Sequence, residues 1–231
     1  MKIAVIPARG GSKRIPRKNI REFAGKPMIS YAISAAINSR LFDHVIVSTD
    51  DDEIASIACQ WGAEVPFKRP DDLSDDFTPT VPVVAHAIQA CREIGWDVDT
   101  VCCIYPGVPF VEVSDLRKGL KILESNASSY VFPVAEYPSA IQRALKQLPD
   151  GRMQTLYPQY ELTRTQDLEL AFFDAGQFYW GRVEAWLANE SIHSHGAGLA
   201  IPLWRVVDID TLEDWKRAEV LYEVLKMKGE T

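Results

Sequence analysis

Residues 3–19 of the chain read IAVIPARGGSKRIPRKN. The apolar run at the start, Ile3 to Ile6, has the length and the β-branched content of a strand buried on both faces, as in the middle of a parallel sheet. A basic loop follows this run directly and therefore leaves the carboxyl edge of the sheet. Open α/β sheets bind their ligands at that edge. The stretch predicts an α/β fold with a ligand site at its first loop.

The composition of this loop is typical of an anion site. Gly10 and Gly11 allow backbone N–H groups to turn toward an anion, and positive charge comes from Arg9, Lys13, Arg14, Arg17 and Lys18. A tight turn with a solvated basic surface is the alternative. We favour the ligand interpretation because the cations lie beside glycines at a strand end, not on a helix face. The motifs GxxxxGK[ST] and GxGxxG are absent, which argues against P-loop NTPases and dinucleotide-binding proteins.

Length and charge narrow the class of protein. A chain of 231 residues fits one α/β domain with room for a small appendage. The 25 Lys and Arg residues against 32 Asp and Glu give a net charge of −7, which argues against a general nucleic-acid binder and favours a small anionic ligand. No apolar stretch reaches the ~18 residues of a spanning helix, and the chain begins with a strand instead of a signal segment. We therefore expect no membrane contact and a cytoplasmic protein.

Cysteine and histidine give no clear metal or disulfide signal. The four cysteines form no CxxC pair and lie in apolar patterns, so buried free thiols are expected at Cys59, Cys91, Cys102 and Cys103. His193 and His195 lie two residues apart and could bind a metal from a strand. We expect them to be solvated loop histidines.

Short apolar strands alternate with helices as far as residue 135. Strands are expected at 45–48, 64–67 (at a sheet edge), 101–105 and 130–134, and helices at 28–37, from about 50 to 61, 81–93 and 114–124. Thr49 or Asp50 is expected to cap the second helix, Gly62 to end it and Ser114 to cap the fourth. This βαβ series predicts a Rossmann-like, mostly parallel sheet flanked by helices.

The regular pattern breaks between residues 136 and 174, where prolines, amides and charges interleave. An excursion of this length is usually functional or an interface. A strand is expected again at 176–180, and a short helix at 183–188.

Residues 204–211 read WRVVDIDT and carry a second chemical signal. On a strand, side chains two apart face the same way, so Asp208 and Asp210 would project together while Ile209 points into the core. Two carboxylates would repel each other, and Mg²⁺ is a usual remedy because it accepts one or two protein carboxylates. Alternatively, Asp210 or Thr211 caps the last helix, with Asp214 in its first turn. Both can hold, and Asp208, which has no helical role, is the stronger metal candidate.

Four separated motifs together resemble the cytidylyltransferases that activate acidic sugars: residues 7–19, VSTD at 47–50, RP at 69–70 and DIDT at 208–211. QRAL at 142–145, TRTQDL at 163–168 and DAGQFYWG at 174–181 resemble the branch that acts on pseudaminic acid. CMP-sialic acid synthetases usually show Asn-Gly near 175–176 and a Gln-Pro-Thr-Ser-Pro turn after the fourth strand. Here these places read Ala175-Gly176 and YPGVP at 105–109. Gly107 and Val108 lack the hydroxyls expected even in the pseudaminic branch.

The resemblance implies a single nucleotidyltransferase domain over 1–231 in which the anomeric hydroxyl of the sugar attacks the α-phosphate of CTP and pyrophosphate departs. By resemblance, Arg9, Ser12, Lys13 and Lys18 hold the phosphates, Arg69 reaches the pyrophosphate, Asn19 reads the cytosine edge, Thr80 lies near the nucleoside, and Pro7, Ala8, Gly10 and Gly11 complete the nucleotide site. The catalytic candidates are Arg9, Lys18 and Asp208, and Mg²⁺ is expected on Asp208 and Asp210.

For an acidic nine-carbon sugar the resemblance suggests Gln142, Arg143, Arg164, Gln166, Gln177 and Tyr179, because a carboxylate and acylamino groups need cationic and amide partners. Surface or dimer contacts are the alternative for each. The excursion at 136–174 resembles the arm through which family members form homodimers, so a partner subunit would complete the sugar site.

The general base stays open between metal-bound hydroxide, Asp208 and solvent. Sialic, legionaminic and 3-deoxy-octulosonic acids are alternative substrates. A non-catalytic nucleotide-binding regulatory domain and an NAD-dependent enzyme are alternatives from other classes.

Overall fold

The computed structural model describes residues 1–227 and is built around one mixed sheet of seven strands. The strand order is β11-β6-β10-β5-β1-β4, and β9 pairs with the carboxyl end of β6, residues 134–136. The strands are β1 (Lys2–Pro7), β4 (His44–Ser48), β5 (Thr100–Ile104), β6 (Tyr130–Glu136), β9 (Phe172–Asp174), β10 (Phe178–Arg182) and β11 (Gly196–Ala200). β1 is parallel to β4 and β5, and β11 to β6, whereas β9 and β10 run in the opposite direction. The prediction of a mostly parallel sheet is confirmed.

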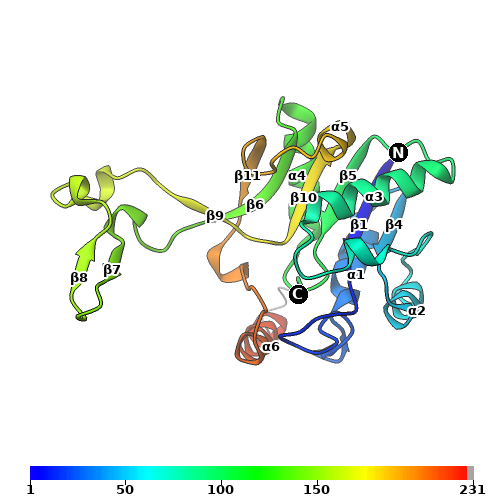
Figure 1. Ribbon diagram of the computed structural model, residues 1–231, viewed down its shortest axis with the longest axis horizontal. Coiled ribbons are helices and arrows are strands. Elements are labelled where there is room, and N and C mark those ends of the chain that lie inside the picture. Colours follow the sequence, from blue (N-terminus) through cyan, green and yellow to red (C-terminus); the bar gives the residue numbers. More distant parts are fainter. Residues whose placement is uncertain (228–231) are drawn as a thin grey trace.

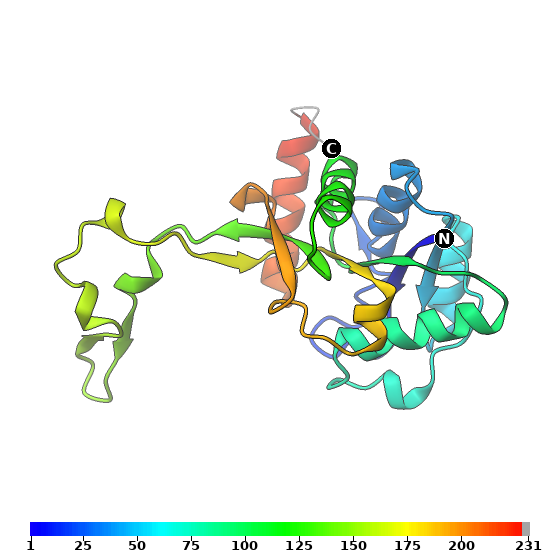
Figure 2. The ribbon, with the colours of Figure 1, turned by 90° about the horizontal axis from the view of Figure 1, so that it is seen from above.

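Helices cover both faces of the sheet (Figures 1 and 2). One face packs against α1 (Ile29–Ser39), α2 (Asp52–Gln60) and α4 (Val113–Ser125), and the other against α3 (Thr80–Glu93) and α5 (Val183–Leu187). The β1 side chains alternate between the two layers: Ala4 and Ile6 face the first, Ile3 and Val5 the second. A strand buried on both faces needs this uninterrupted apolar run.

The last helix, α6 (Leu212–Met227), packs on the loop that follows β1. Figure 1 shows α6 beside this loop, which also contains the short strands β2 (Glu22–Phe23) and β3 (Lys26–Pro27). Phe23 lies fully buried in the hydrophobic cluster between α6 and this loop, with its ring centroid 5.6 Å from that of Trp215 on α6. The cluster therefore brings the end of the described chain back to its beginning.

Residues 137–171 project from the body between β6 and β9 (Figures 1 and 2). They contain the antiparallel pair β7 (Leu145–Gln147) and β8 (Met153–Thr155) and three short 3₁₀ turns. We call residues 136–174 the arm. Most of its apolar side chains are exposed, so it has little core of its own.

Two of the predicted strands are not formed, so these predictions are wrong. Residues 64–67 make a single bridge between Glu64 and Ile46, since Pro66 has no N–H with which to continue a ladder. Residues 204–211 are not a strand either: a 3₁₀ turn at Leu203–Arg205 leads into an irregular segment. The strand β11 was missed because glycine is depleted in strands. A Cβ on Gly196 would lie 2.5 Å from the Phe132 ring, so close packing requires the glycine there.

Helix caps differ from expectation in two of three places. Asp51, not Thr49 or Asp50, caps α2, accepting from the N–H groups of Glu53 and Ile54. Glu112 precedes α4, and Ser114 lies inside that helix. The cap on α6 is confirmed: Thr211 and Asp214 exchange hydrogen bonds of 2.9 and 3.1 Å, as in a capping box.

The four cysteines are free thiols, as expected, but Cys59 is exposed and only the other three are buried. Within residues 1–227, no helix has both the length and the apolar character needed to span a bilayer.

Candidate active site

The site lies at the carboxyl ends of β1 and β5, where the sheet order switches direction. From β1 the chain crosses to β4 on one side, and from β4 it returns to β5 on the other side. Ligands bind at such a switch point in open α/β sheets. The loop after β1, the turn after β5 and residues 206–210 surround this point and leave two neighbouring cavities.

The first cavity, of about 430 Å³, is rich in cations. It is lined by Pro7, Arg9, Ser12, Lys13, Arg14, Lys18, Asn19, Asp76, Pro106 and Asp210. Most of these residues belong to the predicted anion loop. The cavity therefore has the charge that a polyphosphate requires.

The second cavity, of about 330 Å³, shares Lys18 and Pro106 with the first. Its other lining residues are Tyr105, Gly107, Val108, Phe173, Asp174, Ala175, Gly176, Val206, Val207, Asp208 and Ile209. Lys18 thus lies on the boundary between a cationic cavity and a more apolar one. Its Nζ donates to the carbonyl of Ile209 at 2.6 Å and lies 3.6 Å from a carboxylate oxygen of Asp210.

The two late carboxylates face the cations of the first loop. Arg14 donates to Asp210 at 2.6 Å. Desolvation in the crevice and the negative charge of Asp210 raise the pKa of Asp208, against the opposing influence of Lys18 and Arg14. Ile209, only 2% exposed, points into the core between them. The two aspartates are therefore electrostatically coupled, although the segment is irregular instead of a strand.

The cations Arg9 and Lys13 converge on one carboxylate. Arg9 lies 2.7 Å from Asp76 and also donates to the carbonyl of Asp75, and Lys13 pairs with Asp76 as well. Asp76 lines the first cavity. A phosphate entering this cavity would meet the same two cations and would compete with Asp76 for them.

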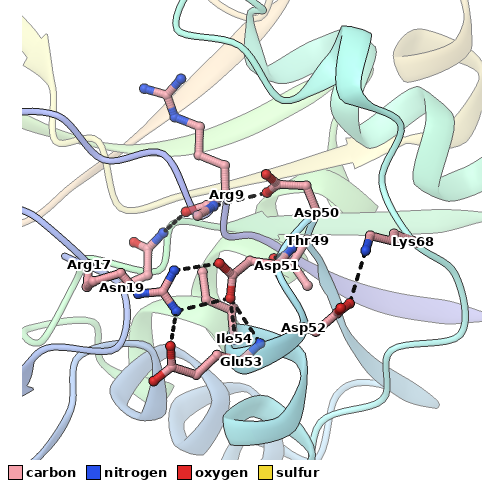
Figure 3. Close-up of polar contacts among 11 residues, drawn as sticks. Arg9, Arg17, Asn19, Thr49, Asp50, Asp51, Asp52, Glu53, Ile54 and Lys68 are labelled. Atoms are coloured by element: carbon pink, nitrogen blue, oxygen red, sulfur yellow. Dashed lines mark hydrogen bonds and ion pairs between the residues drawn. The ribbon is translucent and has the colours of Figure 1, made fainter.

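Arg17 faces away from the cavities and holds the loop against α2. It pairs with Asp51 and Glu53, as Figure 3 shows, and has a positive φ of 57°. The hydrogen bond from Arg17 is the main reason that the pKa of Asp51 falls to about 2. Among the five cations counted in the sequence, Arg17 is therefore the one that supports the loop.

Backbone contacts fix the glycine turn. The Gly10 N–H donates to Asp50 at 3.0 Å, and a Cβ at Gly10 would lie 2.6 Å from a carboxylate oxygen of Asp51. Only glycine permits this approach. Asn19, 7% exposed, donates from its side-chain amide to the carbonyl of Arg9 at 3.0 Å (Figure 3). Asn19 therefore shapes the loop while lining the first cavity.

Arg69 and Thr80 line neither of the two cavities. Arg69 is 4% exposed and donates to the side chain of Ser48 at 3.1 Å and to the Ser48 carbonyl. Burial lowers the pKa of Arg69 to about 10. The Thr80 hydroxyl lies 2.7 Å from the hydroxyl of Tyr105, which lines the second cavity.

A family model described as cytidylyltransferase matches residues 3–173. The chain belongs to the cytidylyltransferase family. This confirms the resemblance drawn from the motifs.

Two curated relatives and one solved structure agree with this assignment. Pseudaminic acid cytidylyltransferase of Campylobacter jejuni serotype O:2 is 40% identical over 96% of each chain. CMP-N,N'-diacetyllegionaminic acid synthase of Legionella pneumophila is 32% identical, also over 96% of each. The structure of a CMP:2-keto-3-deoxy-manno-octonic acid synthetase complexed with CTP superposes with a TM-score of 0.70 at 18% identity, covering 96% of this chain and 98% of that one. This structural likeness confirms the fold class.

The six sugar candidates of this cytidylyltransferase separate into two groups. Gln177 is buried and donates to the Arg205 carbonyl at 2.8 Å, and Tyr179 is buried and donates to Asp174 at 2.9 Å. The others belong to the arm, which projects from the body (Figures 1 and 2), and they line neither cavity of the same chain. There, Gln142 bonds to the Glu169 carbonyl, Arg143 to the carbonyls of Glu161 and Thr163, Arg164 to Asp167, and Gln166 is exposed.

Sequence reasoning missed two charged residues that line the cavities, Asp76 and Asp174. Asp76 was part of an acid-rich loop that carried no chemical signal of its own. Asp174 begins the motif DAGQFYWG, in which only Gln177 and Tyr179 were considered as sugar ligands. The only available signal was its position directly before the Ala175-Gly176 turn.

Proposed function

We propose that this cytidylyltransferase transfers CMP from CTP to the anomeric hydroxyl of pseudaminic acid, giving CMP-pseudaminic acid and pyrophosphate. One observation carries the proposal: the cations of the first loop and the carboxylates at 208–210 meet in a single crevice, on either side of Lys18. The 40% identity to a pseudaminic acid cytidylyltransferase over 96% of each chain supports the choice of sugar.

In this proposal the first cavity takes the triphosphate and the second takes the sugar. Lys18, on their boundary, lies where the α-phosphate would meet the attacking hydroxyl. Negative charge accumulates on the phosphates as the bond to pyrophosphate breaks, and fixed cations stabilise that charge. Arg9 and Lys13 would exchange Asp76 for phosphate oxygens. Asn19, beside them in the cavity wall, would contact the nucleotide.

We also propose that Asp208 and Asp210 hold Mg²⁺. Their donor set fits this ion, because Mg²⁺ takes one or two carboxylates and leaves its other positions to water and phosphate. Within residues 1–227 no group of three or more metal-binding side chains occurs, which agrees with a site that substrate phosphates complete. When bound, the ion would neutralise phosphate charge. Burial and, after it, the charge of Asp210 raise the pKa of Asp208, and a bound cation would offset both effects.

The arm supports a homodimer in our proposal. It carries a concentration of exposed apolar side chains that a monomer would leave in water. They are Tyr137, Ile141, Leu145, Met153, Leu156, Tyr157, Tyr160, Leu162, Leu170 and Phe172. A partner subunit would cover them, and the sugar candidates of the arm would then reach the partner's second cavity. Because CTP is a cytoplasmic nucleotide, we place the reaction in the cytoplasm.

Pyrophosphate release tests the substrate. The protein is supplied with CTP and Mg²⁺ together with pseudaminic, legionaminic, sialic or 3-deoxy-octulosonic acid in separate reactions. We expect turnover with pseudaminic acid to be fastest. If pseudaminic acid is inert while another acid turns over, the choice of sugar is wrong. The legionaminic acid relative, 32% identical, makes legionaminic acid the first competitor.

A further inference from the structure

Asp174 lies at the end of β9, on the wall of the second cavity. Two donors from the segment that follows Asp174 hold its carboxylate, and His193 contacts it as well. One oxygen accepts from the Gly176 N–H at 2.8 Å, and the other accepts from the Tyr179 hydroxyl at 2.9 Å. Backbone pairing of Asp174 with Val134 on β6 fixes the position of its Cα as well. The carboxylate is therefore preorganised.

Tyr179 contacts two residues of the cavity wall: its hydroxyl donates to Asp174, and its ring packs against that of Tyr105. Its side chain is 5% exposed and is not part of the cavity wall. Burial, together with the neighbouring Tyr105 and Asp174, raises the pKa of Tyr179, so the phenol stays protonated and remains a donor. The buried hydroxyl thus orients the Asp174 carboxylate instead of contacting a ligand directly.

Three charged side chains line the second cavity: Lys18, Asp174 and Asp208. In the proposed function, Lys18 meets the phosphate and Asp208 the metal, which leaves Asp174 to face the sugar. A carboxylate has about four acceptor positions. Gly176, Tyr179 and the Nε2 of His193, at 2.8 Å, occupy three of them. One position is left for a donor on the ligand.

The wall around Asp174 is apolar. Val108, Phe173 and Val207 line the same cavity and present hydrocarbon surface. A fixed acceptor beside an apolar wall matches an acylamino group, whose N–H donates and whose acyl methyl group packs on hydrocarbon. A hydroxyl group could donate to the Asp174 carboxylate, but it has no apolar part to pack on the hydrocarbon wall.

We propose that Asp174 determines specificity by accepting a hydrogen bond from an acylamino N–H of the acidic sugar, with the acyl group packed on the adjoining apolar wall. This inference rests on the proposed function, since it assigns the second cavity to the sugar. It makes Asp174 a residue that binds the substrate directly and Tyr179 a residue that positions it.

Asp174→Asn tests this role. Asparagine keeps the volume and one oxygen for the Gly176 N–H, but it removes the charge. Loss of a charge-assisted hydrogen bond should raise the KM for pseudaminic acid roughly tenfold. The KM for CTP should stay within about twofold. Calorimetric titration with pseudaminic acid should show the same rise in Kd, and this readout does not depend on turnover.

His193→Ala is the matched control. The His193 side chain is 66% exposed and does not line the cavity, and it contacts Asp174 and, edge-on, the ring of Phe132. We expect sugar KM and Kd near wild type for this variant. The inference is overturned if Asp174→Asn leaves the sugar Kd unchanged, or if His193→Ala raises it equally, because the role would then be structural. If the wild-type protein turns over another acidic sugar but not pseudaminic acid, the choice of sugar is refuted and not the role of Asp174. The role of Asp174 is then tested by titrating Asp174→Asn with that other sugar.

Discussion

Lys18 and Asp210 come from opposite ends of the chain, and the lysine Nζ lies 3.6 Å from the aspartate carboxylate. Two independent features produce this contact. The buried cluster of Phe23, Trp215 and their neighbours docks α6 on the first loop. The Thr211–Asp214 capping box then fixes where the segment before α6 ends. The crevice is therefore a consequence of core packing and helix capping.

Lys18→Ala should lower kcat at least tenfold, because each charge-assisted contact to phosphate contributes roughly 1.5–3 kcal/mol. Initial rates of pyrophosphate release measure the effect. Lys68→Ala is the control: Lys68 is 63% exposed, pairs with Asp52 and lies outside the crevice. Equal rates for the two variants would show that Lys18 does not act on the reacting phosphates.

Asp208→Asn should lower kcat more than Lys18→Ala does and should weaken the response of the rate to Mg²⁺, because one of two metal ligands loses its charge. Rates measured over a magnesium titration, with chelation of the wild type as reference, test this. Asp52→Asn removes a carboxylate that is 92% exposed and should leave the titration unchanged. A normal magnesium response in Asp208→Asn would remove the metal assignment.

Leu162→Asp should convert the proposed dimer into monomers, since Leu162 is 97% exposed on the arm and a buried charge is costly in an interface. Light scattering after size exclusion gives the mass. Val220→Asp changes an apolar side chain that is 67% exposed on α6 and should leave the dimer intact. A wild-type protein that already has the mass of one chain contradicts the dimer proposal.

Asp51→Asn should destabilise the protein at pH 7 by about 1 kcal/mol, because asparagine still caps α2 but loses the ion pair with Arg17. The folded-state pKa of Asp51, about 2, lies below its ordinary value of 3.8. Its stabilising contribution is therefore complete above pH 3.8 and lost as the pH falls through 2.

Urea unfolding of wild type and Asp51→Asn across this pH range measures the difference in free energy of unfolding. The two curves should converge toward pH 2, whereas a constant difference would mean that the ion pair is not its source.

Strands and helices with strong apolar periodicity were predictable from the sequence. Ile3–Ile6 is an uninterrupted apolar run, and the structure places it inside the sheet, paired with β4 on one side and β5 on the other. β11 was not predictable, because its glycines are explained only by the side chains of β6 and the loop that they pack against.

Charges could be counted from the sequence but not paired. Arg9 and Arg17 stand in the same loop, yet Arg9 enters the cavity and Arg17 binds Asp51. Arg17 binds Asp51 because Asp51 is the N-cap of α2. The sequence analysis expected this cap one or two residues earlier, at Thr49 or Asp50. Ile209, in contrast, was correctly expected in the core although its segment is no strand, because it is the apolar residue between two acids and packs in the cluster of Phe23 and Trp215.

The central claim is that a nucleoside triphosphate lies between the first loop and the 208–210 segment. A crystal structure with CTP and Mg²⁺ tests it most directly. We predict phosphate density in the first cavity in contact with Arg9 and Lys18, and the metal between phosphate oxygens and Asp208. Nucleotide bound elsewhere on the molecule, with Lys18 and Asp208 untouched, would contradict it.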